Sequence, residues 1–272
     1  MANLVGAACS DVGLNRDNNE DSFFFDDSLG LYLVADGMGG HAGGEVASSL
    51  VVQTITDYIK HFKDKPFEYP ERYNIFDNDL SPASNTVLQA IHLANQVVNS
   101  SAQNNEDLHN MGSTLALIMT DGDDLTVAHV GDSRIFRHRG GELTRLTVDH
   151  RLSEDPQFKG VINYESTMVS TLGHTLTRAM GVKPEVMPDI RQMPFQDGDI
   201  YLLSSDGLTD MVSEEMIGQV LDLDENLDQK VQHLIELALA GGGMDNVTAV
   251  LAAAQPKTKS FRKLFNKIVK GN

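Results

Sequence analysis

The chain has 272 residues, 41% of them apolar, which is enough for a large buried core, and no apolar run approaches the roughly 18 residues that a membrane span needs. Its net charge of −18 would repel phosphate backbones, so we expect no nucleic-acid partner. The N-terminus lacks the basic and apolar segments of a signal peptide, and the single cysteine, Cys9, cannot form an internal disulfide. We therefore expect a cytoplasmic protein.

Short apolar segments bounded by Gly, Asp or Asn predict strands at residues 31–35, 114–119, 125–130, 134–138, 200–204 and 247–252. Apolar side chains at spacings of three and four predict helices over residues 47–62, over 84–98 with Ser84 opening the helix, and over 231–239 with a stop at Gly241. Tight turns at 121–124 and 139–142 indicate a largely antiparallel sheet in a single α+β domain over residues 1–255. We interpret 63–82 and 152–173 as irregular insertions.

Four apolar segments end in an aspartate that a small or turn-forming residue follows. The pairs are Asp36-Gly37, Asp132-Ser133, Asp206-Gly207 and Asp245-Asn246. One such aspartate is typical of an ordinary turn, but four that converge at the mouth of a core would repel one another and lose hydration, which costs on the order of several kcal/mol per ion. The sequence has no cysteine pair or HExxH motif typical of zinc sites, so this all-oxygen set favours Mg²⁺ or Mn²⁺.

The glycine-rich segment after Asp36 admits another interpretation. Gly37, Gly39 and Ala42 match the G-x-G-x-x-A pattern of a dinucleotide-binding oxidoreductase. We disfavour it because Asp36 would face an anionic pyrophosphate and the other three aspartates would remain unexplained. Glycines also let the backbone approach a metal, so that the Gly37 carbonyl could serve as a ligand.

Seven motifs occur in the order and rough spacing of one known family. They are RDNNED (16–21), VADGMGGH (34–41), GST (112–114), VGDSR (130–134), LTRAMG (176–181), SDGLTD (205–210) and DNVT (245–248). Together they resemble the PP2C (PPM) metal-dependent serine/threonine phosphatases, in particular the bacterial branch, over about residues 10–251. The resemblance implies a central antiparallel β-sandwich flanked by helices, in α-β-β-α layers, with two Mn²⁺ or Mg²⁺ ions at one end and a weaker third.

The resemblance also implies a role for each matching residue. Asp36 resembles the ligand that bridges both ions, and Asp206 and Asp245 resemble the other ligands of the first ion. The Gly37 carbonyl belongs to the second ion. The remaining matches are Glu20 and Asp21 near the second ion, directly or through water; Asp132 with Asp206 and Asp210 at the third; and Arg16 on the substrate phosphate.

A phosphoserine/phosphothreonine protein phosphatase that opposes a Ser/Thr kinase is therefore the expected function. Two ions that share one water lower its pKa toward neutrality, and the resulting hydroxide attacks phosphorus directly. Met38 stands where animal-type members have a histidine, and His41 is a weak candidate for the general acid, so we favour a metal-bound water. The alternative is a catalytically silent binding module of the same fold. Residues 152–173 match the family's flap poorly. Substrate preference is therefore the property that the resemblance supports least.

The last segment, 256–272, carries six basic residues and no acidic one, so its net charge is +6. Because the whole chain has a net charge of −18, residues 1–255 carry −18 − 6 = −24. Apolar residues at helical spacing between Phe261 and Lys270 predict a short, basic amphipathic helix. A frayed tail, docking on a protein surface, and weak contact with an anionic membrane all remain open. We expect a monomer that is cytoplasmic, with the tail as a candidate peripheral contact at the inner membrane surface.

Overall fold

Eleven short, mostly apolar strands form two antiparallel sheets among residues 4–39, 43–63, 75–154 and 175–255, which are the residues described by this computed structural model. The first sheet has the order β1-β11-β10-β7-β8, and the second has the order β2-β3-β5-β6-β9 with β4 beside β3. The strands of the first sheet are β1 (Leu4–Asp11), β7 (Arg134–Arg139), β8 (Glu142–Arg145), β10 (Ile200–Ser204) and β11 (Val247–Ala254). Those of the second are β2 (Asp21–Asp26), β3 (Leu31–Met38), β4 (Gly112–Ser113), β5 (Leu115–Asp121), β6 (Asp124–Val130) and β9 (Asp189–Pro194).

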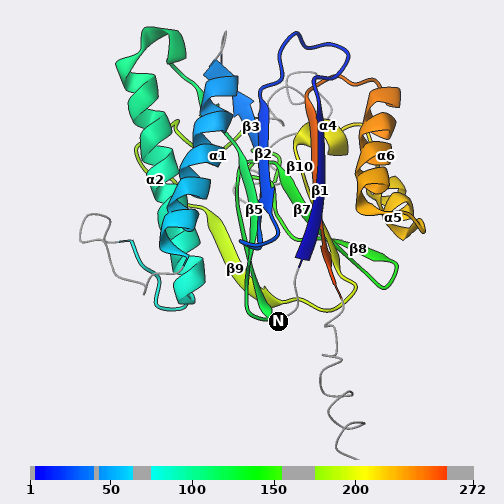
Figure 1. The fold of residues 1–272 in the computed structure, drawn as a ribbon. Coiled ribbons are helices and arrows are strands. Elements are labelled where there is room, and N and C mark those ends of the chain that lie inside the picture. The colour runs from blue at the N-terminus through cyan, green and yellow to red at the C-terminus, as the bar shows by residue number, and fades with distance from the viewer. Residues whose placement is uncertain (1–3, 40–42, 64–74, 155–174, 256–272) are drawn as a thin grey trace, which may run out of the picture.

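Helices cover the outer faces of both sheets (Figure 1). The second sheet lies under α1 (Gly43–Phe62) and α2 (Pro82–Asn104), and the 3₁₀ helix η1 (Glu106–Leu108) follows α2. The first sheet lies under α4 (Asp206–Thr209), α5 (Glu214–Asp222) and α6 (Leu227–Ala240).

Three apolar clusters fill the spaces between these layers. Strand β3 shows why: Leu31 and Leu33 point toward α1 and α2, whereas Tyr32 and Val34 alternate with them and point into the space between the sheets. The third cluster joins the first sheet to α5 and α6. These layers confirm the predicted α+β fold with a central antiparallel sandwich flanked by helices.

The predicted elements are present with shifted ends. The six expected strands correspond to β3, β5, β6, β7, β10 and β11, and the turns at 121–124 and 139–142 close antiparallel hairpins. Ser84 does not open the second helix; α2 begins at Pro82, and the Ser81 hydroxyl accepts a hydrogen bond from the backbone N–H of Ser84. The third helix, α6, ends at Ala240 with Gly241 as its cap, as expected.

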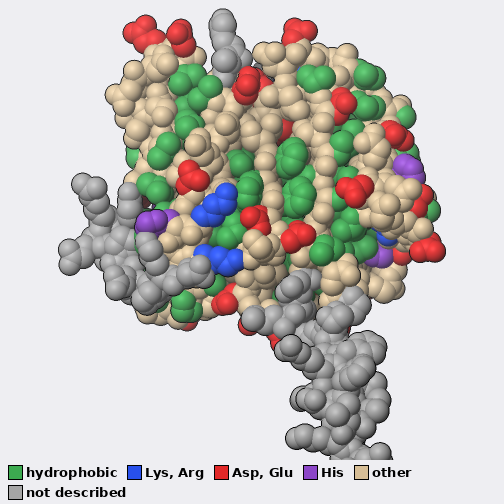
Figure 2. All heavy atoms as spheres, viewed as in Figure 1, with side chains coloured by type: hydrophobic (Ala, Val, Ile, Leu, Met, Phe, Trp, Pro, Cys, Tyr) green, Lys and Arg blue, Asp and Glu red, His purple; other side chains and the backbone are tan. Residues whose placement is uncertain are grey.

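Two of the strands that the sequence did not predict, β2 and β9, lie at the edges of the second sheet. Strand β9 (DIRQMP) lies at a sheet edge, and β2 (DSFFFD) does so too, so neither needs a regular apolar pattern. Residues 64–74 and 155–174 are not described, so the flap predicted over 152–173 lies almost wholly outside the description. Among the described residues, no helix is long and apolar enough to cross a membrane. Acidic side chains are more numerous than basic ones on the face in Figure 2.

Candidate active site

An open cavity of about 770 Å³ lies at the end of the sandwich where β3, β6 and β10 finish and β11 begins. Its wall contains all four of the predicted strand-end aspartates, Asp36, Asp132, Asp206 and Asp245, together with Arg16, Glu20 and Gly37. Residues more than 200 positions apart in the sequence therefore meet in one cavity. Of the remaining predicted residues, Asp21 lies behind this wall and Asp210 is exposed beside it, whereas His41 falls outside the described residues.

The backbone around Asp36 is fixed on both sides. The N–H of Asp36 donates to the Thr114 hydroxyl over 2.9 Å, and the Asp36 carbonyl accepts from the Thr114 N–H over 2.8 Å. The Thr114 hydroxyl also lies 2.6 Å from that of Ser133, next to Asp132. Threonine and serine of the GST and GDS motifs thus join two of the aspartate-bearing strand ends.

Gly37 is required by close packing. A Cβ atom at this position would collide with the backbones of Gly44 and Glu20, and the Gly37 N–H donates to the Glu20 carbonyl over 3.1 Å. This contact brings the loop that carries Glu20 against the end of β3. The Glu20 carboxylate itself lies against Gly44, at the start of α1.

Asn246 holds the loop between β1 and β2 against the start of β11. Its side-chain amide donates to the carbonyls of Val12 and Asn18, each over 2.9 Å, and its side-chain oxygen accepts from the Glu20 N–H over 2.8 Å. The residue is only 5% exposed. This side chain therefore fixes the loop on which Arg16 and Glu20 are carried.

Arg16 lies at the rim of the cavity, with about half of its side chain exposed. Its Nη2 donates to Oδ2 of Asp245 over 2.7 Å, and this hydrogen bond is the main reason that the pKa of Arg16 is raised. The guanidinium thus lies beside one predicted metal ligand and remains accessible from solvent.

Asp21 pairs directly with Asp36 across β2 and β3. Its Oδ2 accepts from the Ser205 hydroxyl over 2.7 Å, and Ser205 in turn accepts from the Thr248 N–H. The other carboxylate oxygen, Oδ1, is buried and has no partner in the described part of the chain. A buried carboxylate oxygen without a donor is costly, which is the condition that a cation or its water relieves.

The aspartates raise one another's pKa. Burial, followed by the charges of Asp21 and Asp206, raises the pKa of Asp36 well above its ordinary value. Burial and the neighbouring Asp132 raise the pKa of Asp206 to about 7, and burial raises that of Asp21 to about 6. Converging carboxylates with hard oxygen atoms are a donor set that divalent Mg²⁺ or Mn²⁺ fits, so the residues match the implied ions.

A second arginine, Arg151, which the sequence did not indicate, forms ion pairs with two of the same aspartates. Arg151 Nε lies 2.5 Å from Oδ2 of Asp132, and its Nη2 lies 2.8 Å from Oδ2 of Asp206. Its position in the sequence, in the segment before residues 152–173, carries no motif that would place it here. Sequence reasoning also missed Thr114, Ser133 and Asn246 as the residues that position the aspartates, although each lies within one of the quoted motifs.

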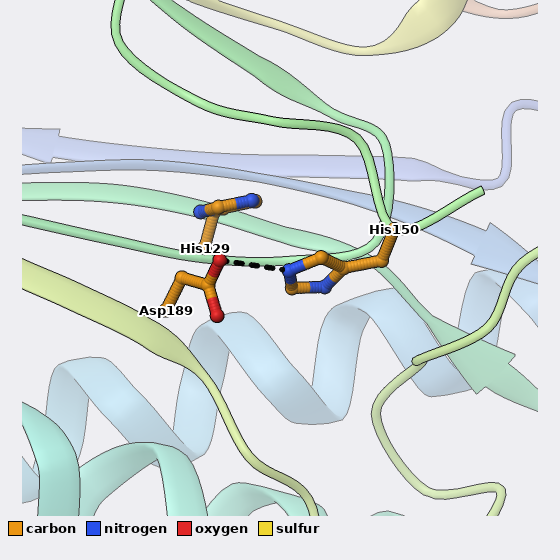
Figure 3. A group of neighbouring side chains, drawn as sticks. All are labelled: His129, His150 and Asp189. Atoms are coloured by element: carbon orange, nitrogen blue, oxygen red, sulfur yellow. Dashed lines mark ion pairs between the residues drawn. The ribbon is translucent and has the colours of Figure 1, made fainter. Parts of the chain in front are cut away.

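Two histidines and an aspartate form a separate group beside this cavity (Figure 3). The His129 and His150 rings stack with centroids 4.5 Å apart, and His150 Nε2 lies 3.3 Å from Oδ2 of Asp189. Arg178 also reaches Asp189 and His150, at 2.5 and 3.2 Å. Because a guanidinium already pairs with the carboxylate, we interpret this group as a support for the surrounding loops and not as a metal site.

Comparison with known proteins adds an independent observation. A family model described as "Protein phosphatase 2C" matches residues 5–241. The serine/threonine protein phosphatase PstP of Mycobacterium tuberculosis is 37% identical over 249 residues, which are 90% of this chain but only 44% of the relative's length. The serine/threonine phosphatase stp of Listeria monocytogenes is 33% identical, over 89% of this chain and 92% of the relative.

Solved structures show the same similarity. The crystal structure of PstP at 1.95 Å superposes with a TM-score of 0.78 and 37% identity, and covers 93% of this chain and all of that one. The catalytic domain of PstP in complex with two manganese ions gives a TM-score of 0.77 at 37% identity, over 94% of this chain and all of that one.

Proposed function

Because the chain belongs to the protein phosphatase 2C family, we propose that it hydrolyses phosphoserine and phosphothreonine in proteins with the help of two Mn²⁺ or Mg²⁺ ions. The observation that carries this proposal is the convergence of Asp36, Asp206 and Asp245 with Arg16 in one open cavity. The chain spans 44% of the length of the M. tuberculosis relatives, so activity, substrates and partners are proposed for this chain and not transferred from them.

We assign the ions to the aspartates as follows. Asp36, between the other carboxylates, would hold both ions, and Asp206 and Asp245 would hold the first. The Gly37 carbonyl would hold the second ion, with Glu20 and Asp21 as further ligands, directly or through water. When bound, the ions supply a nucleophile near neutral pH and stabilise the charge that develops on the phosphoryl oxygens.

Arg16 receives the substrate phosphate in this proposal. Its planar guanidinium can donate two parallel hydrogen bonds to phosphate oxygens, and its exposure at the rim lets a protein-bound phosphate reach it. Nη2 of Arg16 pairs with Asp245, so a phosphate held by Arg16 would lie beside the carboxylates that would hold the ions. The departing alkoxide takes its proton from water, because Met38 lines the cavity where a histidine would be needed.

A catalytically silent binding module is the alternative, and the retention of Arg16 with Asp36, Asp206 and Asp245 disfavours it. Turnover of p-nitrophenyl phosphate separates the two. We expect hydrolysis with Mn²⁺ or Mg²⁺, none after chelation, and recovery when either ion is restored, since hard oxygen ligands hold the ions. Full activity in chelated protein would refute the two-ion proposal, and no activity with either ion would favour the silent module.

The biological setting that we propose follows from the family and the charge distribution. Phosphorylated proteins are the substrates, a Ser/Thr kinase is the opposing enzyme, and the chain acts as a cytoplasmic monomer. The acidic body favours phosphosites in basic surroundings through a long-range attraction that salt weakens. Residues 1–255 form the phosphatase domain, with 152–173 as its flap-like insertion and 256–272 as a separate tail.

The basic tail provides a weak, salt-sensitive contact with anionic lipid in this proposal, at about 1 kcal/mol for each basic residue near the surface. Its test is sedimentation with vesicles rich in anionic lipid, comparing the full chain with one that ends at Gln255. Pelleting of the full chain alone, at low salt, is expected. Equal pelleting of both chains, or none, would eliminate the membrane contact.

A further inference from the structure

The guanidinium of Arg151 lies between two of the predicted metal ligands. Its Nε reaches Asp132 at the end of β6 over 2.5 Å, and its Nη2 reaches Asp206 after β10 over 2.8 Å. The side chains of Arg151 and Asp132 are only 7% and 8% exposed. One buried, planar cation therefore joins two of the carboxylates that the family resemblance assigns to a third, weaker ion.

The backbone on both sides of Arg151 is fixed. The His150 N–H donates to the Gly131 carbonyl over 2.9 Å, and the Gly131 N–H donates back to His150 Nδ1 over 3.1 Å. On the other side, Leu152 donates to the Thr175 carbonyl over 3.0 Å. Gly131, which precedes Asp132, is thus hydrogen-bonded to His150, which precedes Arg151. These bonds hold Asp132 and Arg151 next to each other.

The same segment is anchored elsewhere by its side chains. His150 Nε2 contacts Asp189 (Figure 3), and Asp149 is buried in ion pairs with Arg134 and Arg145. These contacts hold the backbone of the segment in place, so the side chain of Arg151 starts from a fixed position beside Asp132.

A guanidinium and a divalent cation cannot share these oxygens. Arg151 already occupies Oδ2 of both Asp132 and Asp206, so an ion held by the same two carboxylates would lie next to the guanidinium, and two like charges at that distance repel strongly in a buried site. The guanidinium keeps its charge at any physiological pH, and its fork of donors suits two carboxylates. The other carboxylate oxygen of Asp206, Oδ1, does not pair with Arg151, so it is left for the first ion and the first two ions are compatible with Arg151.

We propose that Arg151 takes the place of the third divalent ion, so that this protein binds two ions where a three-ion site was expected. The inference rests on the proposed two-ion function. Its consequence is that the Asp132–Asp206 side of the cavity carries a fixed positive charge that neither chelators nor changes in metal concentration remove.

The test counts Mn²⁺ bound to the full chain, by equilibrium dialysis with elemental analysis, as free Mn²⁺ is raised into the millimolar range. We expect two ions per chain for the wild type and three for Arg151→Ser, with the third bound weakly. Adding Asp132→Asn to Arg151→Ser should return the count to two. Arg145→Ser is the matched control, because it removes the same charge from the same segment while Asp149 keeps Arg134; its count should stay at two.

Three wild-type ions, or two ions in a folded Arg151→Ser variant, would overturn the role of Arg151 and leave the proposed function intact. No bound ion in the wild type would refute the proposed function and this inference together. If Arg151→Ser does not fold, anomalous scattering from wild-type crystals grown with Mn²⁺ decides the question. Two peaks, with the guanidinium still between Asp132 and Asp206, support the inference, and a third peak at Asp132 contradicts it.

Discussion

Replacing Asp36 with Asn should stabilise the metal-free protein. Asp36 pairs across the sheet with Asp21, and the charges of Asp206, Asp132 and Asp245 also raise its pKa. Within the part of the chain that the structure describes, no cationic side chain forms an ion pair with it. Asparagine has the same shape but no charge, so Asp36→Asn removes this repulsion and leaves the backbone bonds to Thr114 in place.

The magnitude follows from the burial of the Asp36 carboxylate beside other carboxylates, with burial as the main cause of its raised pKa. A buried polar group without a compensating partner costs about 1 to 3 kcal/mol, so removing this charge should give a stability gain of about 2 kcal/mol. For a chain of this size that is an increase in Tm of about 4 to 8 °C in chelated protein.

With added metal, the wild type should become more stable than Asp36→Asn. An ion at 100 times its Kd stabilises the folded wild type by about 2.7 kcal/mol, whereas Asp36→Asn lacks the shared ligand and gains much less. The stability of the chelated wild type should also depend on pH in one direction. Because raised carboxyl pKa values make the folded state bind more protons than the unfolded chain between pH 3.8 and about 7, stability of chelated wild type should fall as pH rises through this window, less steeply in Asp36→Asn.

The assay is thermal unfolding of both proteins in chelator and in Mn²⁺, from about pH 5 to pH 8. Asp57→Asn, which removes an exposed charge on α1, is the control, and its Tm should match the wild type in both conditions. A chelated Asp36→Asn protein that is less stable than the wild type, and that gains as much from Mn²⁺, would refute the reasoning.

The remaining predictions concern the other walls of the cavity. Asp245→Asn should lower kcat at least about 10²-fold at saturating metal while the fold survives, and near wild-type turnover would refute its role as a ligand. Arg16→Ala should cost roughly 2 to 4 kcal/mol in kcat/KM with Mn²⁺ affinity nearly unchanged, whereas lost metal binding with a normal KM would make Arg16 structural. Asn246→Ala removes three buried hydrogen bonds and should lower the free energy of unfolding by about 3 kcal/mol in urea titrations; a change below about 0.5 kcal/mol would mean that the loop holds without it.

The layers and most of the interior strands were predictable from the sequence because they obey periodic rules. Apolar runs such as 31–35 and 200–204 are buried on both faces, and their glycine and aspartate boundaries are visible in the sequence. Edge strands were not predictable in this way. In strand β9 half of the residues are exposed and none is fully buried, and the strand is defined by pairing with β6, which no local pattern records.

The convergence of the aspartates was predictable because strand ends on one side of a sandwich must meet. The hydrogen bonds that hold the aspartates in place were not predictable. Thr114 and Ser133, and likewise Asn246 and Glu20, are paired through contacts between distant segments, and the sequence offers only the presence of polar residues in each motif. Arg151 is the clearest case, because its partners lie 19 and 55 positions away and nothing next to it in the chain indicates either of them.

The central claim is that bound divalent ions in this cavity hydrolyse protein phosphoesters, and one titration tests it most directly. Phosphate release from a phosphothreonine peptide is measured as Mn²⁺ is added to chelated protein, alongside the number of ions bound. We predict no release without metal and a rise in kcat that follows the filling of the second site. Release at the full rate from metal-free protein, or no release with both sites filled, would contradict it.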